Sequence, residues 1–126
     1  MIPNQKNKPE LSVVVLGYRA GLELRTFVLE LVNHLENANI NYQIVLVGNY
    51  WPGADDITPQ VVSELARSNS RIKPVIKPKK GGMSWDMRSG LDSSNGELIA
   101  VIDGDGQMHP YDIIRVYQKS DIMISR

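Results

Sequence analysis

Two aspartates stand one residue apart where an apolar run ends, in the segment VIDGDGQMHP at residues 101–110. The carboxylates of Asp103 and Asp105 repel each other unless a positive charge lies between them, and the neighbouring glycines leave the backbone free to admit one. Mg²⁺ and Mn²⁺ favour oxygen ligands of this kind, often with substrate phosphates and water. Gln107 lies two residues further on and can add a carbonyl oxygen. The spacing therefore fits a divalent-metal site.

Two other structures have a similar spacing of acidic and amide residues. A plain Asx-turn that ends a strand is how most Asp-Gly pairs occur, and spacing alone slightly favours it. A calcium-binding EF-hand loop also alternates its ligands, but it needs glycine at its sixth position and glutamate at its twelfth. Here those positions hold Met108 and Ile114. The EF-hand interpretation fails, and the choice between a turn and a metal site stays open at this point.

The rest of the chain predicts the elements that must position these residues. Apolar, β-branched runs indicate strands, and apolar residues at helical spacing indicate helices. The expected strands are residues 11–17, 42–47, 71–77, 97–102 and 121–124, and the expected helices are residues 22–35, 58–67, 84–93 and 110–119. Pro74 predicts that the third strand is short or lies at an edge. Strands that alternate with helices and are apolar throughout predict an α/β fold, with a mostly parallel sheet covered by helices on both faces.

Ligands of an open parallel sheet bind outside the carboxyl ends of its strands. Right-handed connections place the ends of the first, second and fourth strands at one edge. Those ends are residues 16–19, 48–49 and 103–105. We therefore expect one site that combines an aromatic ring, an amide and a pair of carboxylates.

Composition restricts the class of protein. The 126 residues suffice for one domain, and 14 basic residues balance 14 acidic ones, so no net charge draws the chain to nucleic acid. The absence of cysteine excludes disulfides and thiolate zinc sites and suits a reducing compartment. No apolar run approaches the roughly 18–20 residues that span a bilayer. We expect a cytoplasmic location, either free or at the cytoplasmic face of a membrane.

The two ends of the chain suggest a part of a longer protein. Residues 1–10 are polar and are expected to be a disordered lead-in, so that the domain comprises residues 11–126. The fifth strand is followed at once by Arg126, where a partner helix would be expected. The fold is therefore expected to be truncated after this strand.

Four segments, taken in order, resemble the family 2 glycosyltransferases, which have the Rossmann-like GT-A fold. They are SVVVLGYR, YQIVLVGN, GGMSWDMRSGLDSSNGELIAVIDGDGQMHP and DIMISR. The likeness is greatest to the dolichyl-phosphate mannose synthase-like branch, which moves a sugar from a nucleotide onto a polyprenyl phosphate. It covers about residues 11–126, and its most specific part is residues 82–110, where Gly, Arg, Gly-Leu, Gly-Glu and Asp-x-Asp-x-Gln keep the family order.

The resemblance assigns roles position by position. The first acid of Asp-x-Asp, Asp103, helps to hold the nucleotide, and the second, Asp105, ligates Mg²⁺ or Mn²⁺ together with Gln107. Tyr18 matches a residue of the base and ribose pocket, and Arg88 matches an arginine close to the donor. The implied donor-binding residues are Leu16, Tyr18, Asn49, Arg88 and Asp103, and the implied metal ligands are Asp103, Asp105 and Gln107.

Two departures from the family pattern concern the donor. Relatives usually carry Asp-Asp after the second strand, whereas this chain has Gly48 and Asn49. Their first strand usually ends near Pro-x-Tyr-Asn-Glu, whereas this chain has Leu16-Gly17-Tyr18-Arg19, with a basic residue in place of the acidic end of that pattern. The implied partners are a nucleotide-diphosphate sugar and a lipid-linked acceptor. Any membrane association is expected in a part of the protein after Arg126, and the catalytic base is expected there as well. The chain alone is expected to bind donor and transfer little or no sugar. The alternative is a non-catalytic transferase-like domain that serves as an interaction module.

Other polar and aromatic residues receive less specific interpretations. Lys77, Lys79 and Lys80 form a basic stretch before a helix, where phosphate could bind, but a solvated loop is at least as good an explanation. Trp51 and Trp85 fit either the core or the rim of a site, and the sequence does not decide between them.

Overall fold

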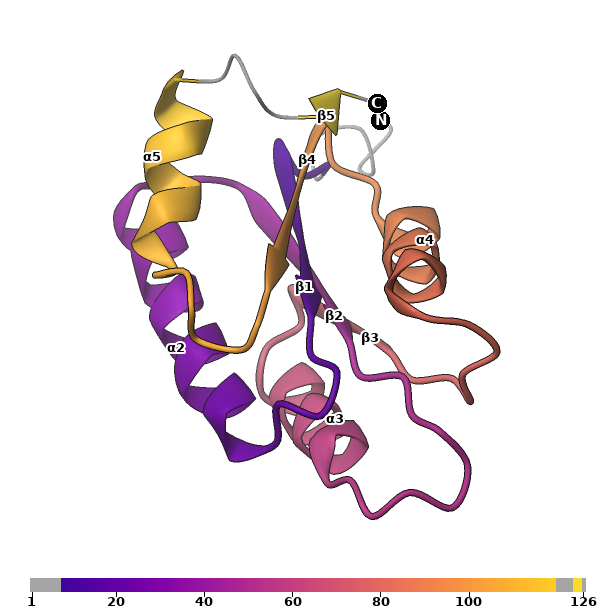
Figure 1. Ribbon diagram of the computed structural model, residues 1–126. Coiled ribbons are helices and arrows are strands. Elements are labelled where there is room, and N and C mark those ends of the chain that lie inside the picture. The colour runs from indigo at the N-terminus through magenta and orange to yellow at the C-terminus, as the bar shows by residue number, and fades with distance from the viewer. Residues whose placement is uncertain (1–7, 120–123, 126) are drawn as a thin grey trace.

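The computed structural model describes residues 8–119 and 124–125 (Figure 1). Its elements, in chain order, are β1 (Leu11–Leu16), α2 (Leu22–Asn37), β2 (Tyr42–Val47), α3 (Thr58–Ser68), β3 (Ile72–Val75), α4 (Met83–Ser93), β4 (Leu98–Asp103), α5 (Tyr111–Lys119) and β5 (Ile124–Ser125). Every predicted helix is present, and the first four predicted strands are present with small changes at their ends. The fifth strand was predicted over residues 121–124, of which 121–123 lie outside the described residues.

The strands form one sheet in the order β3-β2-β1-β4-β5. β1 pairs in parallel with β2 and with β4, β2 pairs in parallel with β3, and β5 pairs antiparallel with β4. The mostly parallel sheet is therefore confirmed. β3 is short and lies at an edge, as Pro74 predicted, because proline cannot donate a hydrogen bond to a second neighbouring strand.

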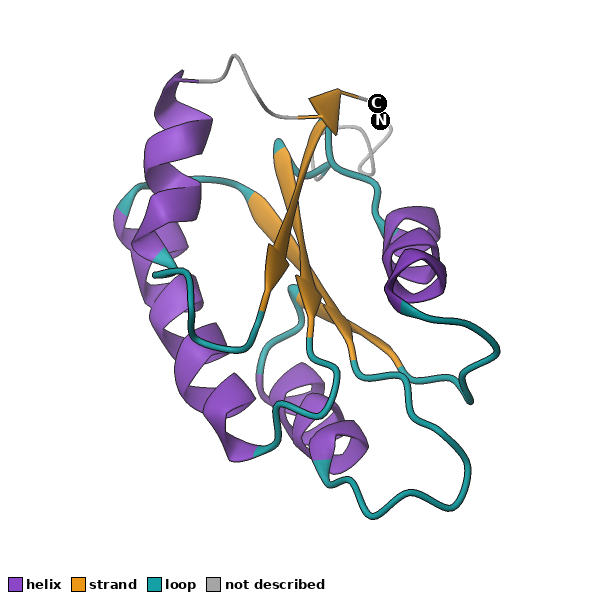
Figure 2. Cartoon of the chain, in the orientation of Figure 1, coloured by secondary structure: helices purple, strands orange, loops and turns teal. Residues whose placement is uncertain are grey.

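Helices cover both faces of the sheet (Figure 2). Successive side chains of a strand point to opposite faces, so β1 divides between two cores. Val13 and Val15 pack into the core that α2, α3 and α5 share, and Val14 and Leu16 pack into a smaller core with α4. The same division explains why β1 is apolar on both sides and wholly buried.

Gly90 lets α4 lie close to the sheet. A Cβ atom on this residue would stand 2.5 Å from Val14 Cγ1 and 3.0 Å from Val47 Cγ2. No larger residue fits there without a shift of the helix or of the strands. α4 carries polar residues toward the carboxyl edge of the sheet, so its distance from the strands also sets the position of those residues.

The amino edge of the sheet includes residues that were expected to be disordered. Pro9 is buried, and its carbonyl accepts a 3.0 Å hydrogen bond from Glu97 N. Glu10 N donates to Asn41 O at 2.9 Å. Ordered pairing thus begins inside the expected lead-in, whose residues 1–7 lie outside the described part of the chain. Within that part, no helix has the length and apolar character that a membrane crossing requires.

Candidate functional site

Backbone hydrogen bonds join the carboxyl ends of three neighbouring strands. Gly17 N donates to Val47 O at 2.8 Å, and Gly104 N donates to Leu16 O at 2.9 Å. In the sheet register, Leu16 lies opposite Val47 on one side and Asp103 on the other. The loops after β1, β2 and β4 therefore start side by side, as the sequence predicted.

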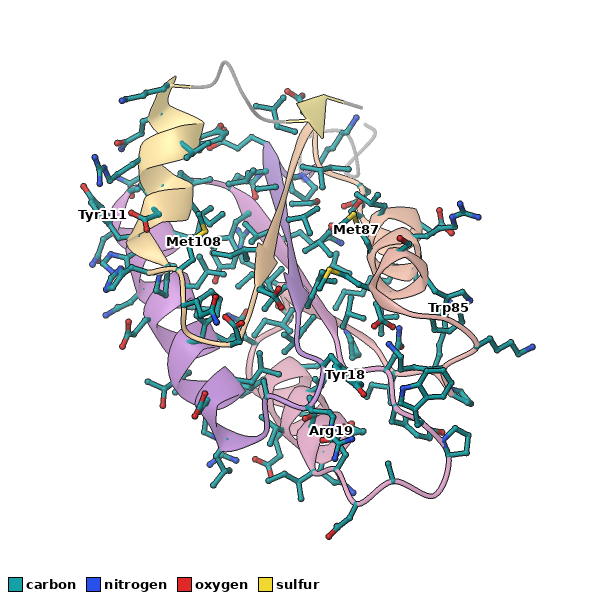
Figure 3. The ribbon with its side chains drawn as sticks, in the orientation of Figure 1. Tyr18, Arg19, Trp85, Met87, Met108 and Tyr111 are labelled. Carbon is teal, nitrogen blue, oxygen red and sulfur yellow. The ribbon has the colours of Figure 1, made fainter. Side chains whose placement is uncertain are left out.

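A cavity of about 280 Å³ opens at this edge. Leu16, Tyr18 and Asp103, three of the predicted donor-binding residues, line it. Tyr18 lies just beyond the carboxyl end of β1 (Figure 3). The other lining residues come from the loop after β2 and from the loop and helix before β4: Trp51, Lys79, Gly82, Met83 and Asp86.

The two aspartates differ in their relation to this cavity. Asp103 ends β4 and lines the cavity, whereas Asp105 lies in the loop that follows and is not a lining residue; both aspartates are exposed. Asp105 Oδ1 accepts a 3.0 Å hydrogen bond from Gln107 N, and Gly106 has a φ of 86°. The Asx-turn considered as an alternative is thus present. It occupies one oxygen of Asp105 and leaves the remaining carboxylate oxygens able to bind a cation.

The electrostatics of the pair favour a cation. Partial desolvation raises the pKa of Asp103, and the negative charge of Asp105 raises it further. A dication beside both carboxylates would oppose both effects. Within the described residues, no group of three or more histidine, aspartate and glutamate side chains could hold a metal ion. The hard oxygen donors at hand suit Mg²⁺ or Mn²⁺, provided that a ligand supplies further oxygens.

Gln107 does not line the cavity with Asp103. It lines a separate groove of about 460 Å³ between α2 and the loop that precedes α5. His109 lines the same groove; its Nε2 lies 3.8 Å from Glu30 Oε2, and its Nδ1 accepts a hydrogen bond from Tyr111 N. The predicted metal ligand Gln107 is therefore near the aspartates in sequence but is directed to a different surface.

Asn49 is buried in a hydrogen-bond network and does not line the cavity. Its Nδ2 donates to Asp86 Oδ1 at 2.9 Å and to Ser89 Oγ at 3.1 Å, and its Oδ1 accepts from Lys77 N at 2.9 Å. Both amide hydrogens are used in this way. Asn49 holds Asp86 and the loop before α4 in place, and its contact with a donor stays a prediction.

Gly48 has no room for a side chain. A Cβ atom there would stand 2.6 Å from Cγ2 of Val62 on α3. Arg88, another predicted donor-binding residue, is exposed and lies outside the cavity lining. Asp86 and Gly90 of α4 are buried, and Arg88 lies between them in the sequence, so helical geometry directs it away from the sheet.

Lys79 and Asp86 were missed by the sequence interpretation. Lys79 is not solvated but buried, and its Nζ forms an ion pair with Asp86 Oδ2, which is buried as well. The ammonium also lies 4.6 Å from the centroid of the Tyr18 ring and 5.6 Å from that of Trp51. One signal was present in the sequence. Asp86 stands four residues before Gly90, on the same face of the helix, and an acid on a buried helix face needs a cation or a hydrogen-bond donor as its partner.

The comparisons with known proteins agree on one family. A family model described as glycosyl transferase family 2 matches residues 12–121. A dolichyl-phosphate beta-glucosyltransferase of Trichomonas vaginalis is 29% identical over 98 residues, covering 74% of this chain and 28% of that protein. An undecaprenyl-phosphate 4-deoxy-4-formamido-L-arabinose transferase of Edwardsiella ictaluri is 26% identical over 112 residues, covering 88% and 34%. The chain spans about a third of the length of the curated relatives that it matches.

Two solved structures share the fold. A mannosyltransferase of Pyrobaculum calidifontis, solved in complex with GDP-Man and Mn²⁺, superposes with a TM-score of 0.60 at 18% identity, covering 78% of this chain and 28% of that one. The TarS protein of S. aureus superposes with the same TM-score of 0.60 at 21% identity, covering 86% and 31%. These similarities support the α/β, GT-A-like architecture.

Proposed function

The chain belongs to glycosyltransferase family 2, and from this premise we propose that it forms the nucleotide-sugar-binding part of a metal-dependent glycosyltransferase. The observation that carries the proposal is the position of Asp103. This residue lines a cavity beside Tyr18, and a second carboxylate follows two residues later. A nucleotide in the cavity would bring its diphosphate toward this pair.

Asp103 and Asp105 are the residues that would hold Mg²⁺ or Mn²⁺, with Gln107 as a third ligand if its side chain turns toward them. A dication held there would supply Lewis-acid stabilisation of the negative charge on a diphosphate leaving group. Tyr18 and Leu16 offer apolar and aromatic surface to the base and ribose. Arg88, another residue of the predicted donor-binding set, is exposed and lies outside the cavity lining, so it would contact a part of the donor that extends beyond the cavity.

For the acceptor we propose a polyprenyl phosphate, as in the dolichyl-phosphate mannose synthase-like branch. The support comes from relatives whose names specify dolichyl-phosphate or undecaprenyl-phosphate transferases. The matched segment is about a third of such proteins, so sugar transfer is proposed for a protein that also contains an acceptor-binding part.

Calorimetry with UDP and GDP, each with and without Mn²⁺, tests the donor-binding proposal. We expect at least one of them to bind in the presence of Mn²⁺. Asp103→Asn and Asp105→Asn should each weaken that binding about tenfold or more, because each removes a charged ligand. Asp55→Asn, in an exposed loop, is the matched control and should change affinity less than about twofold. Failure of the wild type to bind either nucleotide, or equal affinity of all variants, would refute the proposal.

A second candidate function is a transferase-like domain that binds no donor and serves as an interaction module. The buried amide of Asn49 and the lack of space at Gly48 favour it, because the loop after β2 then presents no acid to a nucleotide base. The same calorimetry separates the two candidates, since only the module would leave both nucleotides unbound.

A further inference from the structure

The cavity is also lined by a buried cation, Lys79, to which the proposed function assigns no role. The Lys79 side chain is only 4% exposed, and that of its ion-pair partner Asp86 only 6%. Both residues nevertheless line the 280 Å³ cavity. A buried lysine stabilises the fold poorly by itself, because the desolvation of two charges offsets much of their attraction. The position of this pair at a cavity wall therefore suggests a role in binding.

Two hydrogen bonds from outside the pair hold it in place, one at each residue. Asp86 Oδ1 accepts from Asn49 Nδ2 at 2.9 Å, and its Oδ2 accepts from Lys79 Nζ. The backbone of Lys79 is fixed as well, since its N donates to Tyr50 O at 2.7 Å. Asn49 and Asp86 thus leave the ammonium little freedom, and a ligand would meet a preorganised donor.

The ammonium retains hydrogen-bonding capacity toward the cavity. A lysine ammonium has three N–H donors, and Nζ donates to no oxygen other than Asp86 Oδ2 in the described part of the chain. Its other neighbours are the rings of Tyr18 and Trp51, whose faces attract a cation but accept only weakly. An oxygen atom of a ligand that enters between these rings would be a better acceptor.

We propose that Lys79 is a nucleotide-contacting residue whose ammonium donates a hydrogen bond to an oxygen of the donor nucleotide. The inference rests on the proposed function and adds to it a contact with Lys79 in the cavity that Asp103 also lines. The cavity volume of about 280 Å³ lies at the lower end of the range of ligand pockets, about 300–1,000 Å³. The acceptor is either a carbonyl oxygen of the base or an oxygen of the diphosphate.

The test compares nucleotide affinity with fold stability. Lys79→Met alone leaves the Asp86 carboxylate buried without its cation, so it confounds binding with folding. The decisive variant joins Lys79→Met with Asp86→Asn, which removes both charges and keeps an oxygen that accepts from Asn49. Lys80→Met is the matched control, because it removes the same charge one residue away from an exposed position. Binding of UDP, GDP and inorganic pyrophosphate is measured by calorimetry with Mn²⁺.

We expect the double variant to unfold at a urea concentration similar to that of the wild type. Its affinity for nucleoside diphosphate should fall at least about tenfold, because it loses a charged hydrogen bond to the ligand. Lys80→Met should bind within about twofold of the wild type. A loss that extends to pyrophosphate identifies a phosphate oxygen as the acceptor, and a loss confined to the nucleotide identifies a base or ribose oxygen.

Nucleotide affinity of the double variant equal to that of the wild type would overturn the inference and leave the proposed function intact. Absence of nucleotide binding by the wild type would overturn both. A measurement on the wild type needs no variant: the Lys79 ε-methylene proton resonances, shifted by the Tyr18 ring, should move on saturation with nucleotide. If the double variant does not fold, unchanged resonances in this measurement would overturn the inference.

Discussion

Replacing Asn49 by aspartate changes two hydrogen-bond donors into acceptors without changing the size of the side chain. In the wild type, Nδ2 donates to Asp86 Oδ1 and to Ser89 Oγ, while Oδ1 accepts from Lys77 N. Asn49→Asp preserves only the last of these bonds and places a second carboxylate about where Nδ2 now lies, 2.9 Å from an oxygen of Asp86. Because relatives usually have aspartate here, the family pattern alone would predict an improved site. The structure predicts a less stable protein.

The expected loss follows from the protonation of the buried pair. The Lys79 ammonium compensates only one negative charge, so two buried carboxylates in such contact do not both stay charged: one holds a proton and its pKa rises. Aspartate ordinarily titrates at about 3.9, and one pKa unit corresponds to about 1.4 kcal/mol, so keeping one carboxyl neutral at pH 7 costs about 4 kcal/mol. At pH 5 the same requirement costs about 1.5 kcal/mol. The folded variant binds more protons than the unfolded chain, so its penalty shrinks as pH falls.

Urea unfolding at pH 7 and pH 5 measures both parts of this prediction. Asn49→Asp should lower the free energy of unfolding by about 3–5 kcal/mol at pH 7, and by about 2.5 kcal/mol less than that at pH 5. Asn33→Asp, on the exposed face of α2, is the control and should change stability by about 0.5 kcal/mol or less at either pH. A variant as stable as the wild type at pH 7, or a loss that does not depend on pH, would show that the network around Asn49 is wrongly described.

Three further predictions concern α4 and the aspartate pair. Gly90→Ala should lower the free energy of unfolding by about 1–3 kcal/mol, because its Cβ would stand 2.5 Å from Val14 Cγ1. Gly82→Ala is the control: a Cβ there has no atom within 4 Å, so the free energy of unfolding should change by about 0.5 kcal/mol or less. Equal effects of the two substitutions in urea unfolding would contradict the close packing of α4. The raised pKa of Asp103 means that protons compete for this carboxyl at a higher pH than for an ordinary aspartate, so Mn²⁺ affinity should fall as pH falls through that raised pKa. In a carboxyl-carbon NMR titration, Asp105→Asn should lower the Asp103 pKa only part of the way, because desolvation remains; an unchanged pKa would show that the two carboxylates do not interact.

The elements of this fold could be predicted from the sequence because each of them carries its own pattern. The run LSVVVL is apolar on both sides of the strand, and this property alone implies a sheet covered on both faces. Pro74 by itself predicts that β3 is short or lies at an edge of the sheet. The convergence of Tyr18 and Asp103 at one edge followed from topology, since parallel strands place their carboxyl ends together.

The network behind the cavity wall could not be predicted in the same way. Asn49 and Asp86 are 37 residues apart in the chain, and no periodic pattern links them. Lys79 lies in a loop with two other lysines, and only the tertiary structure distinguishes the buried one from its exposed neighbours Lys77 and Lys80. Arg88 and Asn49, to which the family likeness assigns donor contacts, do not line the cavity, and those contacts stay predictions, because a match in sequence position does not specify the direction of a side chain.

The central claim is that Asp103 and Asp105 hold a dication together with the diphosphate of a nucleotide in the cavity beside Tyr18. Paramagnetic Mn²⁺ tests it most directly, because it broadens the amide NMR resonances of nearby residues. With nucleoside diphosphate present, trace Mn²⁺ should first broaden the resonances of residues 103–107 and of Tyr18, and should spare Asn41 at the opposite edge of the sheet. Broadening that begins at other acidic residues such as Asp55, or that is the same with and without nucleotide, would contradict the claim.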